Sequence, residues 1–166
     1  MSAAFPGVRV GLGFDVHPFA DDPTRALVLG GVTLPGERGL AGHSDADVVA
    51  HALADALLGA AGLGDLGQHF PDRDPAWHGV DSMTILAAVV ALVAGQGWGL
   101  VNADCSVVIE APRLAPHREA MAARLATVAG GPVSVKATRA EGLGALGRVE
   151  GAACLATVLL GSRGEP

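Results

Sequence analysis

Segments typical of strands alternate with segments typical of helices along this chain, and this order constrains the fold more than any other feature. Four apolar, strand-like segments lie at residues 8–13, 100–109, 133–137 and 152–160. Helices are expected at residues 44–61, 82–95 and 116–128, and a short hairpin at 27–34. Interspersed elements of this kind predict a single α/β or α+β sandwich, in which helices cover one face of a small mixed four-stranded sheet.

The composition favours a chain that buries more surface than one small monomer provides. Of its 166 residues, 50% are hydrophobic and only 17% are charged, whereas ordinary soluble domains carry about 25% charged residues. This shortfall favours a homo-oligomer. The length predicts a single domain spanning residues 1–166, with residues 1–7 and 162–166 at its periphery. The net charge of −6 offers no basic surface for nucleic acid.

Cysteine usage and apolar runs favour a cytoplasmic protein that does not enter a membrane. Cys105 and Cys154 lie far apart in strand-like segments, which is typical of buried free thiols in a reducing compartment. Residues 1–10 lack the basic start and apolar run of a signal peptide. The apolar run at 83–94 is too short to span a bilayer.

Asp15 and His17 are the first candidate metal ligands. They follow the first expected strand, and residues two apart in extended backbone point the same way. The Gly11-x-Gly13 pair before them allows another backbone, or a phosphate, to come close. An Asp-x-His pair alone is weak evidence for a metal site. With His51 as a third ligand, however, the set suits a borderline divalent metal and leaves a fourth position open for substrate.

The segment around His51 strengthens the metal hypothesis. Ser44 and Asp47, three residues apart before an Ala/Leu-rich run, predict a helix that begins with a capping box. Asp47, His51 and Asp55 then share one helix face. A carboxylate hydrogen-bonded to a metal-bound His fixes its tautomer, so either Asp47 or Asp55 is a candidate partner for His51.

Three further segments suggest a phosphorylated substrate. Residues 64–67 combine glycines with Asp65, a pattern able to grip a sugar diol. Residues 110–116 join a strand to a helix, where backbone amides bind anions or the polar edge of a base. Residues 136–144 bring two cations, a hydroxyl and Glu141 to the end of a strand, and a hard oxygen ligand suits magnesium on a diphosphate.

These motifs together resemble the 2-C-methyl-D-erythritol 2,4-cyclodiphosphate synthase family. The resemblance rests on Gly-x-Gly-Phe-Asp-Val-His, His-Ser-Asp-x-Asp-Val-x-x-His and Gly-Asp-x-Gly-x-x-Phe-Pro-Asp-x-Asp-Pro, and it runs from about residue 8 to residue 160. It implies a ferredoxin-like homotrimer with active sites between adjacent subunits. It also implies a lyase of the non-mevalonate isoprenoid pathway, which converts 4-diphosphocytidyl-2-C-methyl-D-erythritol 2-phosphate to the cyclic diphosphate and CMP. The substrate's own 2-phosphate would be the nucleophile.

The resemblance assigns a role to each matching position. It implies zinc (or manganese) at Asp15, His17 and His51, and magnesium with the substrate diphosphate at Glu141. His43 and Arg139 are the implied catalytic side chains. The implied substrate contacts are Asp15, His17, His43, Ser44, Asp65, Gly67, Phe70, Asp72, Asp74, Ile109, Ala111, Pro112, Arg113, Leu114, Ala115, Ala137, Thr138, Glu141 and Arg148.

Two departures from the family pattern bear on these roles. Arg139 stands where the family usually has a phosphate-contacting Thr, and its charge and fork geometry also suit a phosphate. Ala145 stands where a Phe usually lines the trimer-axis cavity, which in the family holds isoprenoid diphosphates near Arg148 and Glu150. Two other hypotheses remain: a zinc-dependent phosphodiesterase or hydrolase that activates water, and a non-catalytic trimer that binds nucleotide or metal.

Overall fold

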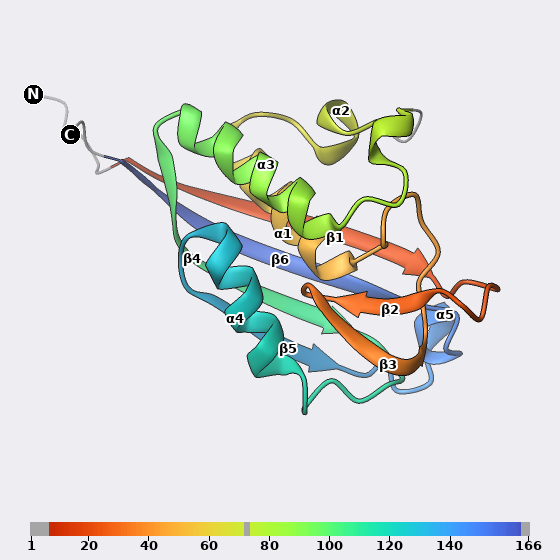
Figure 1. Cartoon of the computed structure of the whole chain (residues 1–166). Helices are drawn as coiled ribbons and strands as arrows, with labels where there is room; N and C mark the ends of the chain where they lie inside the picture. The colour runs from red at the N-terminus through yellow and green to blue at the C-terminus, as the bar shows by residue number, and fades with distance from the viewer. Residues whose placement is uncertain (1–6, 72–73, 164–166) are drawn as a thin grey trace, which may run out of the picture.

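The computed structural model describes residues 7–71 and 74–163, and its centre is one mixed sheet of four strands (Figure 1). The outer strand β1 pairs antiparallel with β6, β6 pairs antiparallel with β4, and β4 pairs parallel with β5 at the other edge. In spatial order the strands are β1 (Val8–Pro18), β6 (Gly151–Ser162), β4 (Trp98–Val108) and β5 (Val133–Thr138). This confirms the expected α+β architecture.

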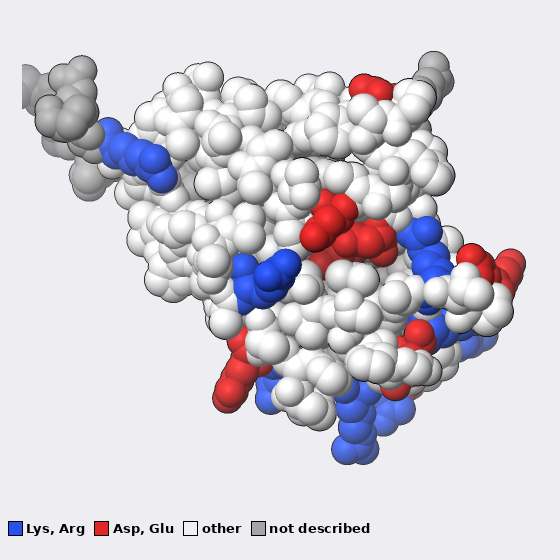
Figure 2. Space-filling model, in the orientation of Figure 1, with Lys and Arg blue, Asp and Glu red and all other residues white. Residues whose placement is uncertain are grey.

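Three long helices cover one face of this sheet (Figure 1). They are α1 (Val48–Ala61), α3 (Ser82–Gly95) and α4 (Arg118–Ala129). α1 packs on β1 and β6, α4 packs on β5, and α3 packs against α1. The buried side chains of these helices and of the strands beneath them form one hydrophobic core. Figure 2 shows few charged side chains over most of this helix-covered face, with a group of acidic ones near its centre.

Shorter elements connect the long ones. β2 (Ala26–Leu29) and β3 (Val32–Arg38) form the expected hairpin, whose turn places Gly30 and Gly31 at positive φ. The segment 64–75 is expected from the sequence to be a loop, but it contains the short helix α2 (Leu66–His69), and the 3-10 helix η1 (Pro75–Trp77) begins at its end. A last short helix, α5 (Gly144–Gly147), precedes β6. Within the described ranges, no helix combines the length and the apolar run that crossing a bilayer requires.

The opposite face of the sheet carries large apolar side chains that this chain leaves exposed. Alternation along β1 turns Val10, Leu12 and Phe14 away from the helices, and their exposed fractions are 70%, 66% and 55%. Leu155 of the neighbouring strand β6 is also exposed. A contiguous apolar patch of this kind marks an interaction surface.

The structure corrects two expected boundaries. Asp15 and His17 are not in a loop after the first strand, because β1 continues through both of them to Pro18, paired with β6 along its length. The helix predicted to begin at Ser44 begins at Val48, and its N-cap is Asp47. The Asp47 carboxylate accepts hydrogen bonds from the first turn of α1, whereas the Ser44 hydroxyl accepts one from Ala46 in the preceding turn.

Candidate metal centre and a second pocket

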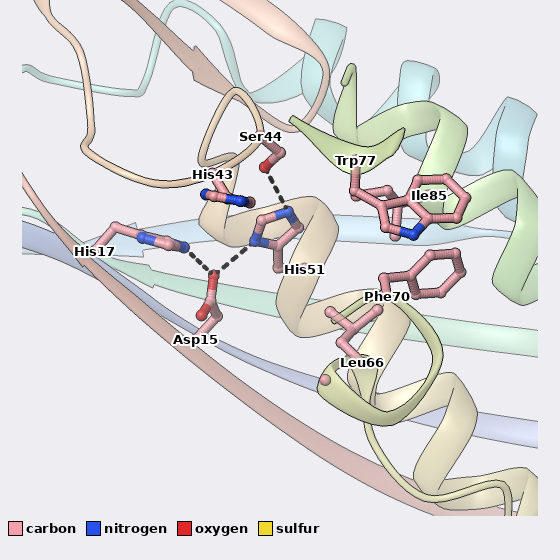
Figure 3. A pocket seen from close by; sticks show the side chains of 10 residues that line it. Asp15, His17, His43, Ser44, His51, Leu66, Phe70, Trp77 and Ile85 are labelled. Atoms are coloured by element: carbon pink, nitrogen blue, oxygen red, sulfur yellow. Dashed lines mark hydrogen bonds and ion pairs between the residues drawn. The ribbon is translucent and has the colours of Figure 1, made fainter. Parts of the chain in front are cut away.

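Asp15, His17 and His51 lie together as the sequence predicted (Figure 3). Asp15 and His17 point to the same side of β1, and His51 reaches them from the first turns of α1. Asp15 Oδ2 lies 3.2 Å from His17 Nε2 and 3.1 Å from His51 Nδ1. One ligand atom from each residue lies within 4.8 Å of the others. One carboxylate oxygen and two imidazole nitrogens fit a borderline divalent metal.

Two glycines allow α1 to bring His51 this close to β1. A Cβ added at Gly11 would lie 2.0 Å from the carbonyl oxygen of Ala56, and one at Gly13 would lie 2.0 Å from that of Ala52. Both positions therefore admit no side chain, because helix backbone occupies the space that a Cβ needs. Of the two expected reasons for the Gly-x-Gly pair, the structure supports close approach of another backbone.

The three groups alter one another's protonation. Burial alone would raise the pKa of Asp15, but hydrogen bonds from His17 and His51, and their charge, outweigh it and hold that pKa well below its usual range. Burial likewise disfavours the charged form of His17. The hydrogen bond and charge of Asp15 and the Ala41 carbonyl nevertheless raise the pKa of His17. The cluster therefore attracts positive charge, as a cation site must.

Arg25, which no sequence pattern identified, holds the loop beside this cluster. Its guanidinium donates to the carbonyl oxygens of Leu40, Gly42 and Ser44, the Gly42 contact at 3.1 Å. The same loop accepts the 2.8 Å contact from His17 Nδ1 at Ala41. Arg25 thereby fixes the segment that presents His43 and Ser44 to the site.

These side chains line a cavity of about 260 Å³. Figure 3 shows the charged and polar residues on one side and a group of apolar residues on the other. Of the predicted site residues, the lining includes Asp15, His17, His43, Ser44, His51, Gly67 and Phe70. Sequence reasoning missed Leu66, Trp77 and Ile85. The rings of Trp77 and Phe70 pack edge-to-face with their centroids 4.9 Å apart. The only sequence feature that could have indicated Trp77 as a site residue is a large aromatic side chain in an aromatic-poor chain.

The acidic residues expected near this cavity have other partners. Asp65 is exposed and caps α2 by accepting from the backbone N–H of Gln68. Asp74 caps the 3-10 helix η1 through Ala76. Neither lines the cavity. Asp72 lies outside the described residues.

Neither carboxylate expected to bind His51 does so. Asp47 is fully buried and accepts four backbone N–H groups, at Gly30 and Gly31 of the hairpin turn and at the start of α1. Asp55 accepts the backbone N–H of Leu66 and so ties α1 to α2. The expectation was wrong because backbone N–H groups nearer to each carboxylate donate hydrogen bonds to it. The Nε2 atom of His51 instead faces the hydroxyls of Ser82 and Ser44.

A second pocket, of about 210 Å³, lies at the ends of β4 and β5. The predicted site residues that line it are Ile109, Pro112, Arg113, Leu114, Ala115, Ala137, Thr138 and Arg139, while Ala111 does not. Arg139 donates to Glu110 Oε1 through Nε at 3.1 Å and through a terminal nitrogen at 2.7 Å. The other oxygen of Glu110 accepts the backbone N–H of Ala140 at 3.0 Å. Glu110, which the sequence did not single out, thus holds Arg139 at the pocket.

The two pockets lie at the same end of the sheet but at opposite edges. Pro18, the last residue of β1, pairs with Gly151 of β6. Val108, the last residue of β4, pairs with Ala153 of β6 and with Thr138 of β5. Glu141 is exposed and lines neither pocket, and Arg148 pairs with Glu150 at 2.6 Å. One chain alone therefore does not bring Glu141 or Arg139 to the Asp15 cluster.

Comparison with known proteins identifies a family and relatives that match nearly the whole chain. Residues 8–161 match the model of the YgbB family. The chain is 51% identical over 165 residues to the 2-C-methyl-D-erythritol 2,4-cyclodiphosphate synthase of Synechococcus sp. (strain CC9311), covering 96% of this chain and 98% of that relative.

Two solved structures share the fold. The CDP complex of IspF from Plasmodium falciparum is 29% identical with a TM-score of 0.82, covering 96% of this chain and 99% of that one. The bifunctional IspDF from Campylobacter jejuni is 40% identical with a TM-score of 0.90, covering 95% of this chain but only 43% of that larger chain. With a family match over nearly its whole length and the Asp/His/His cluster in place, the chain belongs to the YgbB family.

Proposed function

We propose that this protein is a 2-C-methyl-D-erythritol 2,4-cyclodiphosphate synthase, a lyase of isoprenoid biosynthesis. The observation that carries this conclusion is the Asp15/His17/His51 cluster on a cavity, in a chain about half identical to such synthases over most of its length. In the reaction, an oxygen of the substrate's 2-phosphate attacks the β-phosphorus. The bond from that phosphorus to the bridging oxygen breaks, and CMP leaves with the oxygen.

The metal belongs at the three clustered side chains. Asp15, His17 and His51 would hold zinc or manganese, whose charge polarises the β-phosphate when the metal is bound. His43 and Ser44, held by the Arg25-bound loop, lie on the same cavity and would orient the 2-phosphate and the methylerythritol. Phe70 and Trp77 form an apolar wall of the cavity and would shield the reacting groups from water. Phosphoryl transfer depends mainly on such positioning and on charge neutralisation.

The second pocket suits the cytidine end of the substrate. Backbone groups around residues 109–115 would bind the cytosine, and Thr138 lies beside them. The CDP complexes of two solved structures with this fold support a nucleotide ligand for this protein. Arg139 would neutralise a phosphate of the diphosphate, and Glu141 would bind magnesium with it.

A homotrimer would unite the two pockets. The active site needs the pocket at the β1 edge of one copy and the pocket at the β5 edge of its neighbour. A ring in which the β1 edge of each copy lies beside the β5 edge of the next, with the open faces of the sheets turned inward, supplies that pairing. The exposed apolar face formed by Val10, Leu12 and Phe14 supports such an assembly. Residues 1–166 would form one cytoplasmic synthase domain. Arg148 and Glu150 would lie near the trimer axis, where the small Ala145 disfavours a snug isoprenoid site.

Phosphorus NMR of the purified protein with the cytidyl diphosphate substrate, zinc and magnesium tests the function. Two coupled signals of a cyclic diphosphate, with one CMP released per product, are expected. Acyclic phosphate products would indicate a zinc-dependent hydrolase instead. Substrate that binds but stays intact would indicate a non-catalytic binding protein.

A further inference from the structure

We propose that Ser82 and Asp45 form a hydrogen-bonded relay that orients His51 and keeps its proton on Nε2, so that Nδ1 is the metal-binding atom. This inference rests on the metal site proposed above and assigns two positioning residues to it. Ser82 Oγ lies 2.8 Å from His51 Nε2. The same hydroxyl donates to Asp45 Oδ1, and the backbone N–H of Ser82 donates to Asp45 Oδ2 at 3.1 Å.

The relay is built into the fold. Ser82 is the first residue of α3 and is only 1% exposed. Asp45 lies in the loop before α1, and its backbone N–H donates to the carbonyl of Val80 at 3.2 Å. A further backbone hydrogen bond, from Gly79 to His43 at 2.8 Å, runs beside it. The two segments are therefore fixed to each other by main-chain contacts as well as by the Asp45 carboxylate.

Counting protons decides the tautomer. A hydroxyl has one proton to donate, and Ser82 gives it to the Asp45 carboxylate, which only accepts. Ser82 Oγ can then only accept from His51, so Nε2 must carry the proton. Ser44 Oγ, 3.2 Å from the same nitrogen, is placed as a weaker second acceptor.

The remaining nitrogen of His51 then faces the metal position. In the Nε2–H tautomer, Nδ1 has a free lone pair, and it lies 3.1 Å from the Asp15 oxygen that also contacts His17. Without a metal, a proton on Nδ1 makes this contact the hydrogen bond to Asp15. In the metal-bound protein the metal takes the place of that proton, because the relay holds the other proton on Nε2. The relay thus prepares Nδ1 as a ligand, and a hydrogen bond at the opposite nitrogen makes an imidazole a better metal donor.

Zinc binding by the full-length protein tests the relay without relying on turnover. Zinc affinity is measured by competition with a chromophoric chelator for the wild type, for Ser82→Ala and for Asp45→Asn. Loss of the partner behind a metal-bound His typically weakens binding about 10- to 100-fold, and we expect a loss in that range for Ser82→Ala. Asp81→Ala is the matched control. It removes the N-cap of the same helix but no atom of the relay, so zinc affinity should be retained.

Nitrogen-15 NMR of the His51 ring in the zinc-loaded wild type gives a second readout that needs no variant. A proton on Nε2 with zinc on Nδ1 is the expected result. A proton on Nδ1, or Ser82→Ala with zinc affinity within about twofold of the wild type, would overturn the relay alone. Failure of the wild type to bind zinc would overturn the proposed metal site and the relay together. Should Ser82→Ala fail to fold, Asp45→Asn and the wild-type spectrum still decide the question.

Discussion

Replacing Gly13 by Ala should separate α1 from β1 and damage the metal site at a distance. The new Cβ would lie 2.0 Å from the Ala52 carbonyl oxygen and 2.6 Å from the Ala56 nitrogen, both in helix backbone. Ordinary contact begins near 3.4 Å, so the helix must withdraw by about 1.4 Å. Overpacking of this kind typically costs about 1–3 kcal/mol of unfolding free energy.

His51 moves with the helix, whereas Asp15 stays on the strand. Metal sites tolerate changes of only about 0.2 Å in ligand distance, and a misplacement near 1 Å can cost about 100-fold in turnover. We therefore expect Gly13→Ala to lower the melting temperature, by about 2–4 °C per kcal/mol for a chain of this size. We also expect it to weaken zinc binding by at least tenfold, on the order of the loss that supporting contacts cause.

Gly59→Ala is the matched control on the same helix. A Cβ at Gly59 meets nothing within 4 Å, and Ala in place of a helical Gly stabilises by roughly 0.5–1 kcal/mol. Both variants are compared with the wild type by thermal unfolding in chelator and by zinc competition. A Gly13→Ala protein with wild-type melting temperature and zinc affinity would refute the close-approach argument.

Three further predictions concern residues outside the metal cluster. Asp47→Ala leaves four backbone donors without their acceptor, so urea unfolding should reveal a loss of about 3 kcal/mol or more; a loss below about 1 kcal/mol would contradict this. Arg25→Ala should lower kcat about tenfold by releasing the loop it binds, and Arg25→Lys should not rescue it, because one ammonium lacks the guanidinium fork; full rescue by Lys would show that charge alone matters. Glu110 has a lowered pKa because, although partial burial raises it, the hydrogen bond and charge of Arg139 lower it by more. The ion pair therefore forms above the ordinary Glu pKa and is lost as the pH falls through the lowered value. In Arg139→Thr, a carboxyl NMR titration should find the Glu110 pKa raised, and turnover should fall; unchanged or higher turnover would exclude a phosphate contact by Arg139.

The sequence was sufficient where function depends on local spacing. Asp15 and His17 lie on one side of β1 because strand periodicity requires it. The helix that carries His51 ends at Ala61, as expected, and Gly62 caps it in the αL conformation that glycine readily adopts. Hydrogen bonds between distant segments could not be predicted from local spacing. Asp47 accepts hydrogen bonds from the hairpin turn, and Ser82, on another helix, contacts His51. Both contacts join segments distant in sequence, and neither has a local pattern.

The placement of the two pockets at opposite edges of the sheet has a genetic consequence. In the proposed trimer each chain contributes the metal half of one active site and the nucleotide half of the next. Two alleles, one defective at His51 and the other at the residues around Arg139, would each be inactive alone. Mixed assemblies of the two chains would contain some interfaces with both intact halves, so the alleles should complement each other when expressed together.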